Sequence, residues 1–524
     1  MFAAPDIDDL NVFKHAEPGD EKKNILLITS DQQHYMTLGV NNPDIKTPHL
    51  DRLAKMGTTF NRAYTTNPTC TPARASIITG KYPSQHGAWA LGTKLMEHEH
   101  CLGQDFKAAG FRTALIGKAH FQPLAGSEKF PSLESYPILQ DLDYWRKFNS
   151  PFYGFEHIEI CRNHTDEAHV GQHYAIWMEE NGLKNWRDYF RTPTGSQPKP
   201  QYGSWHLPEK FHYNNWIAQR SNALLEDYTK TGENFFLWAS FFDPHPTYLV
   251  PEPWASMYDP EDMKVEQMTE GELDDMPWHY KTTQLDDKQA RDIFSCCDER
   301  GGNHVHGFKS HHRKNKAKDM TLYFGMVSML DHYIGKILDK VDQLGLAEKT
   351  LIMFTTDHGH YYGQHGLTAK GPFNYEDGIK IPMIVSMPKS IPQNKKSDSL
   401  QSLVDFAPTA LSIAGLDIPW GMSGIDQKEV WLGKKTAARD HVIVEDRFQP
   451  TKLYTKTYIT DRYKLTVYQG QDYGELFDLE KDPGELTNLW DRKDFADLKN
   501  SLTTQLLHAM IAAEPIPMPR ITVA

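Results

Sequence analysis

The stretch Ile25-Leu-Leu-Ile-Thr-Ser-Asp-Gln32 (ILLITSDQ) joins a short apolar run to two polar residues. An apolar run of this length is typical of a strand that is buried on both faces of a sheet. Segments with helical periodicity separate it from four similar runs: Thr113–Gly117, Phe235–Phe242, Leu351–Thr355 and Ile381–Ser386. The clearest helical segment spans about Met320–Leu344. This alternation predicts an α/β fold in which helices sandwich a large, mainly parallel sheet.

The pattern changes near residue 436. The segments HVIVED, KLYTKTYITD and YKLTVYQG alternate with period two, and a final helical stretch begins near Asp494. Alternation of this kind is typical of antiparallel strands with one solvated or helix-covered face. We therefore expect a large α/β domain over residues 1–435. A small α+β domain, with an antiparallel sheet and one helix, is expected over residues 436–524.

The overall charge excludes two classes of partner. The chain of 524 residues has 56 Lys and Arg against 69 Asp and Glu, a formal net charge of −13. A chain this acidic is not expected to coat nucleic acid or to bind a membrane through a polybasic surface. No apolar run is long enough to span a bilayer, and the N-terminus lacks a signal-peptide core. The expected compartment is the cytoplasm, or the periplasm or exterior if an export signal was removed.

Polar side chains follow four of the predicted strands. In chain order, the residues after these strands are Asp31-Gln32, then Lys118 with His120, then His245, and finally Asp357-His358. Lys370 follows the last pair after a short loop. A single Asp at a strand end is often only a helix cap. The carboxyl ends of parallel strands meet at one edge of a sheet, where ligands bind. We therefore predict one site with two parts. A hard metal would be held by Asp31, Gln32, Asp357 and His358, and a basic ring would be formed by Lys118, His120, His245 and Lys370.

The stretch Asn67–Gly80 (NPTCTPARASIITG) adds a candidate nucleophile. Pro72 near its start and Gly80 at its end predict a helix that begins at Cys70. The free backbone N–H groups and the dipole at a helix N-terminus favour an anion there. Arg74 lies one turn later on the same face and is placed to clamp what Cys70 carries. The five cysteines have no repeated spacing, so no disulfide framework is expected.

Several motifs resemble those of one family. Cys70-Thr-Pro-Ala-Arg74 with Thr79-Gly80 resembles the C-x-P-x-R…TG signature of type I sulfatases in the alkaline phosphatase superfamily. Gly117-Lys118-Ala-His120 is similar to the second family signature, G-K-x-H. Asp357-His358-Gly359 stands where the family has its second metal pair, and Glu475–Pro483 resembles the C-terminal pattern. The resemblance covers nearly the whole chain in order and implies an alkaline-phosphatase-like fold.

The resemblance also implies a chemistry. A formylglycine-generating enzyme would oxidise Cys70 to formylglycine, whose hydrated aldehyde attacks the sulfur of a small-molecule or saccharide sulfate ester. Arg74 and Lys118 would hold the modified residue and the sulfate, and His120 would help deprotonate its second hydroxyl. His245 would be the general acid, with Lys370 beside it. One divalent metal would be bound by the modified Cys70 with Asp31, Gln32, Asp357 and His358.

The metal ligands depart from the usual pattern and leave alternatives open. Calcium-dependent sulfatases usually have Asp-Asp and Asp-Asn pairs, whereas this chain has Asp31-Gln32 and Asp357-His358. An imidazole suits Mn²⁺ better than Ca²⁺, so either ion remains a candidate. The Gln/His variant resembles a branch that includes phosphonate monoester and phosphodiester hydrolases. The retained G-K-x-H favours sulfate, because phosphonate hydrolases of that branch tend to lack it.

Other interpretations concern the remaining polar clusters. An inactive binding protein with this fold is disfavoured, since it would have no reason to keep both the basic ring and Cys70-x-x-x-Arg74. The histidines of the His304–His312 loop are expected to be structural or solvent-facing, with substrate contact as the alternative. Trp205, His206, His212 and Trp216 fit either a sugar site or insertion packing. The sequence leaves the oligomeric state open, a homo-oligomer included.

Overall fold

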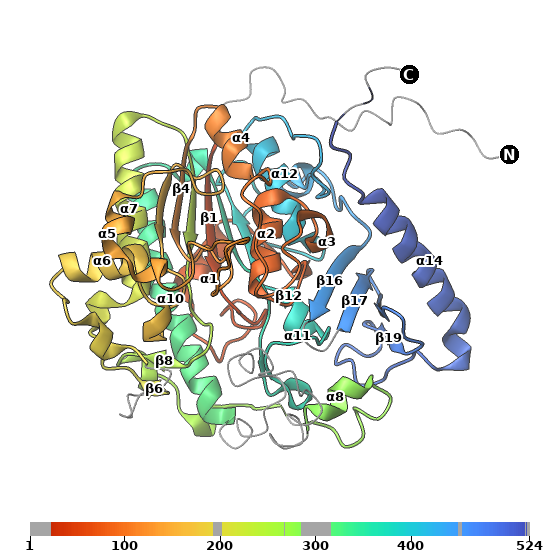
Figure 1. Ribbon diagram of the computed structural model, residues 1–524. Helices are drawn as coiled ribbons and strands as arrows, with labels where there is room; N and C mark the ends of the chain where they lie inside the picture. The colour runs from red at the N-terminus through yellow and green to blue at the C-terminus, as the bar shows by residue number, and fades with distance from the viewer. Residues whose placement is uncertain are drawn as a thin grey trace.

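A computed structural model describes residues 22–191, 202–266, 268–284, 316–448, 453–518 and 520. The His304–His312 loop therefore lies outside the described residues. A central sheet of eight strands dominates the molecule (Figure 1). In sheet order the strands are β14 (Lys395–Ser397), β2 (Thr58–Phe60), β13 (Met383–Ser386), β9 (Thr350–Thr356), β1 (Asn24–Ser30), β7 (Phe235–Ser240), β4 (Arg112–Gly117) and β5 (His157–Ile160).

The predicted parallel sheet is confirmed, with one reversed strand. Strands β9, β1, β7, β4 and β5 are parallel, whereas β13 runs antiparallel to β9 and β2. The predicted strand Ile381–Ser386 is divided into β12 (Lys380–Ile381) and β13. Pro382 separates the two, because proline has no N–H to donate to a ladder. The predicted run Phe235–Phe242 leaves the sheet two residues early, after Ser240.

Alternate residues of β1 face two separate cores. Leu26 and Ile28 pack on one face with α1 (Pro48–Lys55), α7 (Tyr213–Thr231) and α10 (Lys316–Gln343). Ile25 and Leu27 pack on the other with α2 (Cys70–Thr79), α4 (Leu102–Ala108) and α12 (Phe406–Ile413). Both faces of β1 are thus covered, as its continuous apolar sequence predicts. No helix in the described ranges has the length and apolarity to cross a bilayer.

The small C-terminal sheet predicted from period-two alternation is also present. It contains β16 (Val442–Phe448), β17 (Leu453–Ile459), β18 (Tyr463–Tyr468) and β19 (Gly474–Asp478), all antiparallel. Helix α14 (Ala496–Ala512) lies along its outer side (Figure 1). Ile443 of β16 packs with α14, whereas Val442 and Val444 pack with Tyr64 of the large domain. The alternation therefore reflects burial on both faces by different partners.

The aromatic insertion before α7 is packing, not an open sugar surface. Trp205, His212 and Trp216 are buried, at 2%, 0% and 0% exposure, and the two tryptophans belong to the core around β1. His206 is the exposed member of the four. Of the two interpretations of this segment, the structure supports the packing one.

A buried ion network joins the C-terminal sheet to the segment that follows Lys370. Lys464 of β18 has no exposed surface and pairs with Glu485 and, at 3.7 Å, with Glu376. Its amine also donates to the Asn374 carbonyl at 2.6 Å. Burial raises the pKa of Glu485 to about 7, although Lys464 opposes the shift. Glu485 therefore depends mainly on this buried amine, whereas Glu376 also contacts Lys380 at 3.4 Å.

Replacement of Lys464 tests this network. Lys464→Ala is expected to lower the free energy of unfolding by about 3–5 kcal/mol, because it removes the cation that pairs with the buried Glu485 carboxylate. Lys434→Ala is the matched control, since its side chain and that of Glu429 are 61% and 33% exposed. The control should cost less than about 1 kcal/mol. Urea denaturation followed by circular dichroism measures both, and equal small losses would refute the role of Lys464.

Candidate active site

The sheet order brings the predicted residues to one edge. Strands β9, β1, β7 and β4 are direct neighbours, and their carboxyl ends carry Asp357-His358, Asp31-Gln32, His245, and Lys118 with His120. Cys70 is the first residue of α2, and Lys370 follows β11 (Thr368–Ala369). The four candidate metal ligands thus follow the neighbouring strands β9 and β1. Three of the four basic residues follow the next pair, β7 and β4.

Cys70 lies at the centre of these groups. Its Sγ is 3.0 Å from the Lys370 amine, 3.2 Å from His358 Nε2 and 3.8 Å from an Asp31 oxygen. The Lys118 amine is 4.0 Å away. Burial and Asp31 raise the pKa of the Cys70 thiol, but Lys118 and Lys370 outweigh them and the net shift is downward. The position of Cys70 therefore favours a negative charge, as expected for the start of a helix.

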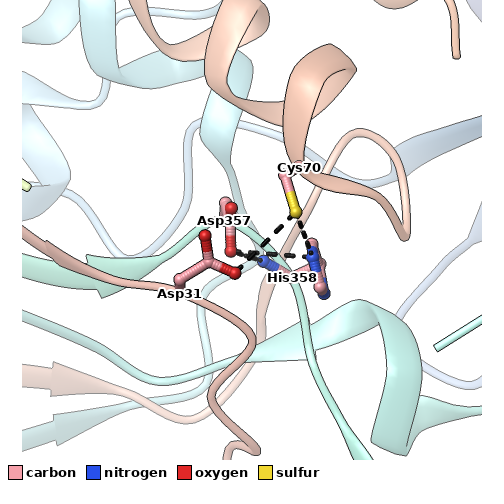
Figure 2. A group of neighbouring side chains, drawn as sticks. All are labelled: Asp31, Cys70, Asp357 and His358. Atoms are coloured by element: carbon pink, nitrogen blue, oxygen red, sulfur yellow. Dashed lines mark hydrogen bonds and ion pairs between the residues drawn. The ribbon is translucent and has the colours of Figure 1, made fainter. Parts of the chain in front are cut away.

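Four side chains form a candidate metal site. One ligand atom from each of Asp31, Cys70, Asp357 and His358 lies within 4.8 Å of the others, and all four residues are buried (Figure 2). His358 Nδ1 lies 2.9 Å from the Gly359 carbonyl, which fixes the proton on Nδ1 and leaves a lone pair on Nε2, beside the Cys70 sulfur and the Lys370 amine. Burial opposes ionisation of Asp31, yet Lys118, His245 and Arg74 hold the pKa of its carboxyl well below the usual value.

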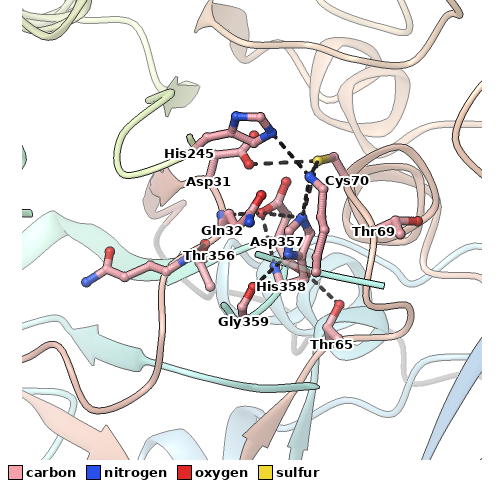
Figure 3. A network of polar contacts seen from close by, with 12 residues as sticks. Asp31, Gln32, Thr65, Thr69, Cys70, His245, Thr356, Asp357, His358 and Gly359 are labelled. Carbon is pink, nitrogen blue, oxygen red and sulfur yellow. Dashed lines mark hydrogen bonds and ion pairs between the residues drawn. The ribbon is translucent and has the colours of Figure 1, made fainter. Parts of the chain in front are cut away.

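Gln32 has one oxygen without a protein partner. Its Nε2 donates to His360 Nδ1 at 2.8 Å, which fixes the orientation of the amide. Its buried Oε1 has no hydrogen-bond partner in the described parts of the chain, and the side chain lies beside Asp31 and Asp357 (Figure 3). The backbone of Gln32 has φ 60°, a left-handed conformation that is costly outside glycine and concentrates at functional sites. Two carboxylates, an amide oxygen and an imidazole fit a divalent cation.

Arg74 bonds mainly to the protein itself, and its predicted contact with the group that Cys70 carries stays a prediction. Its Nε donates to Asp357 at 2.8 Å, and its terminal nitrogens donate to Asp31 at 3.2 Å and Ser240 at 2.8 Å. A further bond of 3.0 Å reaches the Lys118 carbonyl. Four of the five guanidinium N–H groups are thus committed to the protein itself. Arg74 orients the carboxylates, and Asp357 and Asp31 in turn raise its pKa against the effect of burial.

Lys370 and His245 form a hydrogen-bonded pair. The Lys370 amine is 3.2 Å from His245 Nε2 and 3.4 Å from His358 Nε2. An ammonium only donates, so His245 accepts at Nε2 in this arrangement. Burial, followed by the charge of Lys370, holds the pKa of His245 well below its usual value. In this pair the Lys370 amine donates a proton to the hydrogen bond with His245 Nε2, and the amine also lies 3.0 Å from the Cys70 sulfur.

Sequence reasoning missed Arg162. Its guanidinium donates to His120 Nε2 at 2.7 Å, and its Nε lies 3.6 Å from Glu134. Arg162 follows β5, the strand next to β4. The strand-end rule finds it once His157–Ile160 is accepted as a strand, but this run alternates His-Ile-Glu-Ile and is not a continuous apolar segment.

Two further residues support the site from outside the predicted set. His360 holds the Gln32 amide and contacts the Tyr248 hydroxyl at 2.9 Å. Ser240, the last residue of β7, accepts from Arg74 and donates to the Lys118 carbonyl at 2.6 Å. His360 is visible in the sequence as the second histidine of Asp357-His-Gly-His360. Ser240 carries no sequence signal of this kind, because its role depends on which strand lies beside β4.

Comparisons with known proteins identify the family. Residues 23–416 match the profile of the family described as Sulfatase. Residues 363–512 match that described as N-sulphoglucosamine sulphohydrolase, C-terminal. An arylsulfatase of Clostridium perfringens is 28% identical over 486 residues, which cover 91% of this chain and 92% of the relative.

Two more similarities extend the comparison. A multifunctional alkaline phosphatase superfamily protein of Trinickia caryophylli is 27% identical over 93% of this chain and 96% of its own. The solved structure of a phosphonate monoester hydrolase from Silicibacter pomeroyi superimposes with a TM-score of 0.77 at 19% identity, covering 96% of this chain and 98% of the other. That likeness establishes the shared fold. The match of the family profile to most of the chain establishes more: the protein belongs to the sulfatase family and is a sulfuric ester hydrolase.

Proposed function

We propose that the protein hydrolyses a sulfate monoester with a formylglycine derived from Cys70 and one divalent metal ion. The observation that carries this proposal is the convergence of side chains from four other chain segments on the Cys70 sulfur. The Lys370 amine and His358 Nε2 lie 3.0 and 3.2 Å from it, and Lys118 and Asp31 lie at 4.0 and 3.8 Å. All of the proposed site residues precede residue 436, so we assign catalysis to the domain of residues 1–435.

The sequence around Cys70 supports its modification. Cys70-Thr-Pro-Ala-Arg74 carries the pattern that is oxidised in this family, and a formylglycine-generating enzyme is the maturation partner we propose. Hydrated formylglycine supplies two hydroxyls on one carbon, one to attack sulfur and one to expel sulfate afterwards. The chain itself provides the anion-favouring helix N-terminus and two amines, Lys118 and Lys370, beside that carbon.

Asp31, Gln32, Asp357 and His358 are the residues that would hold the metal. Two observations support this donor set: the Nε2 lone pair of His358 lies 3.2 Å from the Cys70 sulfur, and Gln32 Oε1 has no hydrogen-bond partner among the described residues. A bound divalent ion would polarise a sulfate oxygen and lower the pKa of a nearby hydroxyl. Arg74 keeps the two carboxylates in place, since it bonds both. We assign Ca²⁺ or Mn²⁺, with Mn²⁺ favoured by the imidazole.

The Lys370–His245 pair is the proposed proton donor to the leaving alcohol. It lies beside the nucleophile position, and the two side chains already share a hydrogen bond of 3.2 Å. As negative charge develops on the leaving oxygen, a proton delivered by this pair stabilises it. Lys118 is held against Asp31 and is proposed to contact a sulfate oxygen.

Sulfate esters are proposed over phosphonate monoesters, the second candidate. A sulfate monoester presents three non-bridging oxygens, whereas a phosphonate presents two and an apolar carbon substituent. Lys118, Lys370 and His120 offer polar contacts around the position, and a carbon substituent would leave one of them without a partner. The retained Gly117-Lys-Ala-His120 sequence supports the same choice. An arylsulfatase among the relatives and the match to the N-sulphoglucosamine sulphohydrolase C-terminal profile support an aryl or sugar sulfate as the substrate class.

The state of Cys70 is the first test. Mass spectrometry of peptides from active protein should find formylglycine at position 70, and a hydrazide should trap it. Specific activity should rise in proportion to the modified fraction, and Cys70→Ala should be inactive. Cys161 is the internal control, because it is equally buried and should remain a thiol. Full activity with an unmodified Cys70 thiol would exclude this mechanism.

Metal removal is the second test. Chelation should abolish turnover, and Mn²⁺ or Ca²⁺ should restore it and raise the melting temperature of the apoprotein. Asp357→Ala should lose that metal-dependent rise, whereas Asp461→Ala, whose side chain is 85% exposed, should keep it. Thermal melts with and without metal provide a readout independent of activity. A normal metal-dependent shift in Asp357→Ala would contradict the assignment.

Substrate preference is the third test. With 4-nitrophenol as the common leaving group, the sulfate ester should give a higher kcat/KM than the phenylphosphonate monoester. The expected ratio is at least about tenfold, the effect of roughly one unsatisfied polar contact. Steady-state kinetics on metal-loaded, fully modified protein measure it. A clear preference for the phosphonate would replace the first candidate function by the second.

A further inference from the structure

The contact between Arg162 and His120 determines where the His120 proton lies. The guanidinium has five N–H donors and no acceptor. It approaches Nε2 of His120 at 2.7 Å, in a buried position. Nε2 must therefore offer its lone pair, which places the single proton of a neutral imidazole on Nδ1.

The charged form of His120 is disfavoured by the same surroundings. A second proton on Nε2 would point at the guanidinium. Burial, and then the charges of Arg162, Lys118 and Arg74, hold the pKa of His120 well below its usual value, and the charge of Asp31 opposes them. His120 is thus a neutral imidazole with its proton on Nδ1.

The surrounding backbone fixes this geometry. The Glu134 carboxylate accepts from the backbone N–H groups of His120, Phe121 and Gln122 at 3.0, 2.9 and 3.1 Å. It also lies 3.6 Å from Arg162 Nε. One carboxylate thus holds both the main chain of His120 and the guanidinium that contacts its ring. The left-handed backbone of His120, with φ 58°, is kept in place by these bonds.

The other ring nitrogen has no partner. His120 Nδ1 is buried and makes no hydrogen bond to any described residue. A buried N–H donor without an acceptor costs free energy, unless another group accepts its hydrogen bond. His120 follows Lys118 by two residues, at the edge of the sheet where Cys70 lies.

We propose that His120 acts as a hydrogen-bond donor through Nδ1–H to an oxygen of the reacting group, and that Arg162 is the positioning residue that imposes this tautomer. The acceptor is a sulfate oxygen or a hydroxyl of the modified Cys70. This inference rests on the proposed function, and it replaces the role of general base that the family resemblance implies for His120. The lone pair that a base would need is occupied by Arg162.

Two amide substitutions separate a donor from a base. In His120→Asn the side-chain NH₂ reaches the position of Nδ1, whereas in His120→Gln it reaches that of Nε2. Neither amide is basic. We expect His120→Asn to keep kcat/KM within about tenfold of the unaltered enzyme. His120→Gln and His120→Ala should lose about a hundredfold, the typical effect of one contact to developing charge. Equal losses in all three variants would overturn the proposal.

Arg162 is tested by a double-mutant cycle. Arg162→Met should lower kcat in the enzyme with His120, because the ring is free to adopt the other tautomer. In the His120→Asn background the same change should cost much less, since no tautomer remains to be selected. Arg162→Lys, which keeps a donor, is the conservative control and should retain most activity. Full additivity of the two changes would show that Arg162 does not act through His120.

A spectroscopic readout is independent of turnover. In protein labelled with ¹⁵N-histidine, the signals of His120 are identified as those lost in His120→Gln. They should report a protonated Nδ1 and an unprotonated Nε2, and they should change in Arg162→Met but not in Arg162→Lys. A protonated Nε2 in the unaltered protein would refute the inference. Because unmodified, metal-free protein serves for this measurement, its outcome stands apart from failure of the sulfatase mechanism.

Discussion

Arg74 bonds to groups at the ends of four neighbouring strands. It contacts Asp357 after β9, Asp31 after β1, Ser240 at the end of β7 and the Lys118 carbonyl after β4. The side chain has no exposed surface. A buried charge is tolerated only where its partners and hydrogen bonds are complete. Loss of any one of these four contacts would therefore leave the guanidinium incompletely paired. Arg74 thus ties Asp31, Asp357 and the main chain of Lys118 together at this edge.

The same constraint explains why α2 begins where it does. Arg74 lies one turn after Cys70, so fixing the guanidinium among the strand ends also fixes the helix N-terminus beside them. Gly80 ends the helix with φ 64°, a left-handed conformation in which glycine is favoured. The start of α2 at Cys70 and the two carboxylates are thus tied to one side chain. The positive charges of Lys118 and Arg74 also keep the pKa of Asp31 low against the effect of burial, so that its carboxylate stays charged.

Support from outside the central sheet completes the site. The C-terminal sheet holds the segment after Lys370 through Lys464, which donates to the Asn374 carbonyl. On the opposite side, Glu134 holds the chain after Lys118 and the guanidinium of Arg162. Lys464 and Glu134, both far from Cys70 in sequence, thereby hold the segments that carry Lys370 and His120. Hydrogen bonds that orient donors in advance are what electrostatic stabilisation of a transition state requires.

The sequence by itself determined the fold class, five of the central strands to within two residues, and the set of polar residues at their ends. It did so because apolar runs and helical periodicity are local properties, and because the ends of parallel strands share one edge. The tertiary structure alone decided that β13 is reversed, that Arg74 bonds carboxylates, and that Arg162 reaches His120. Those outcomes depend on which strands are neighbours and on which buried donors and acceptors come within hydrogen-bonding distance. Both are non-local properties, so no short stretch of the sequence predicts them.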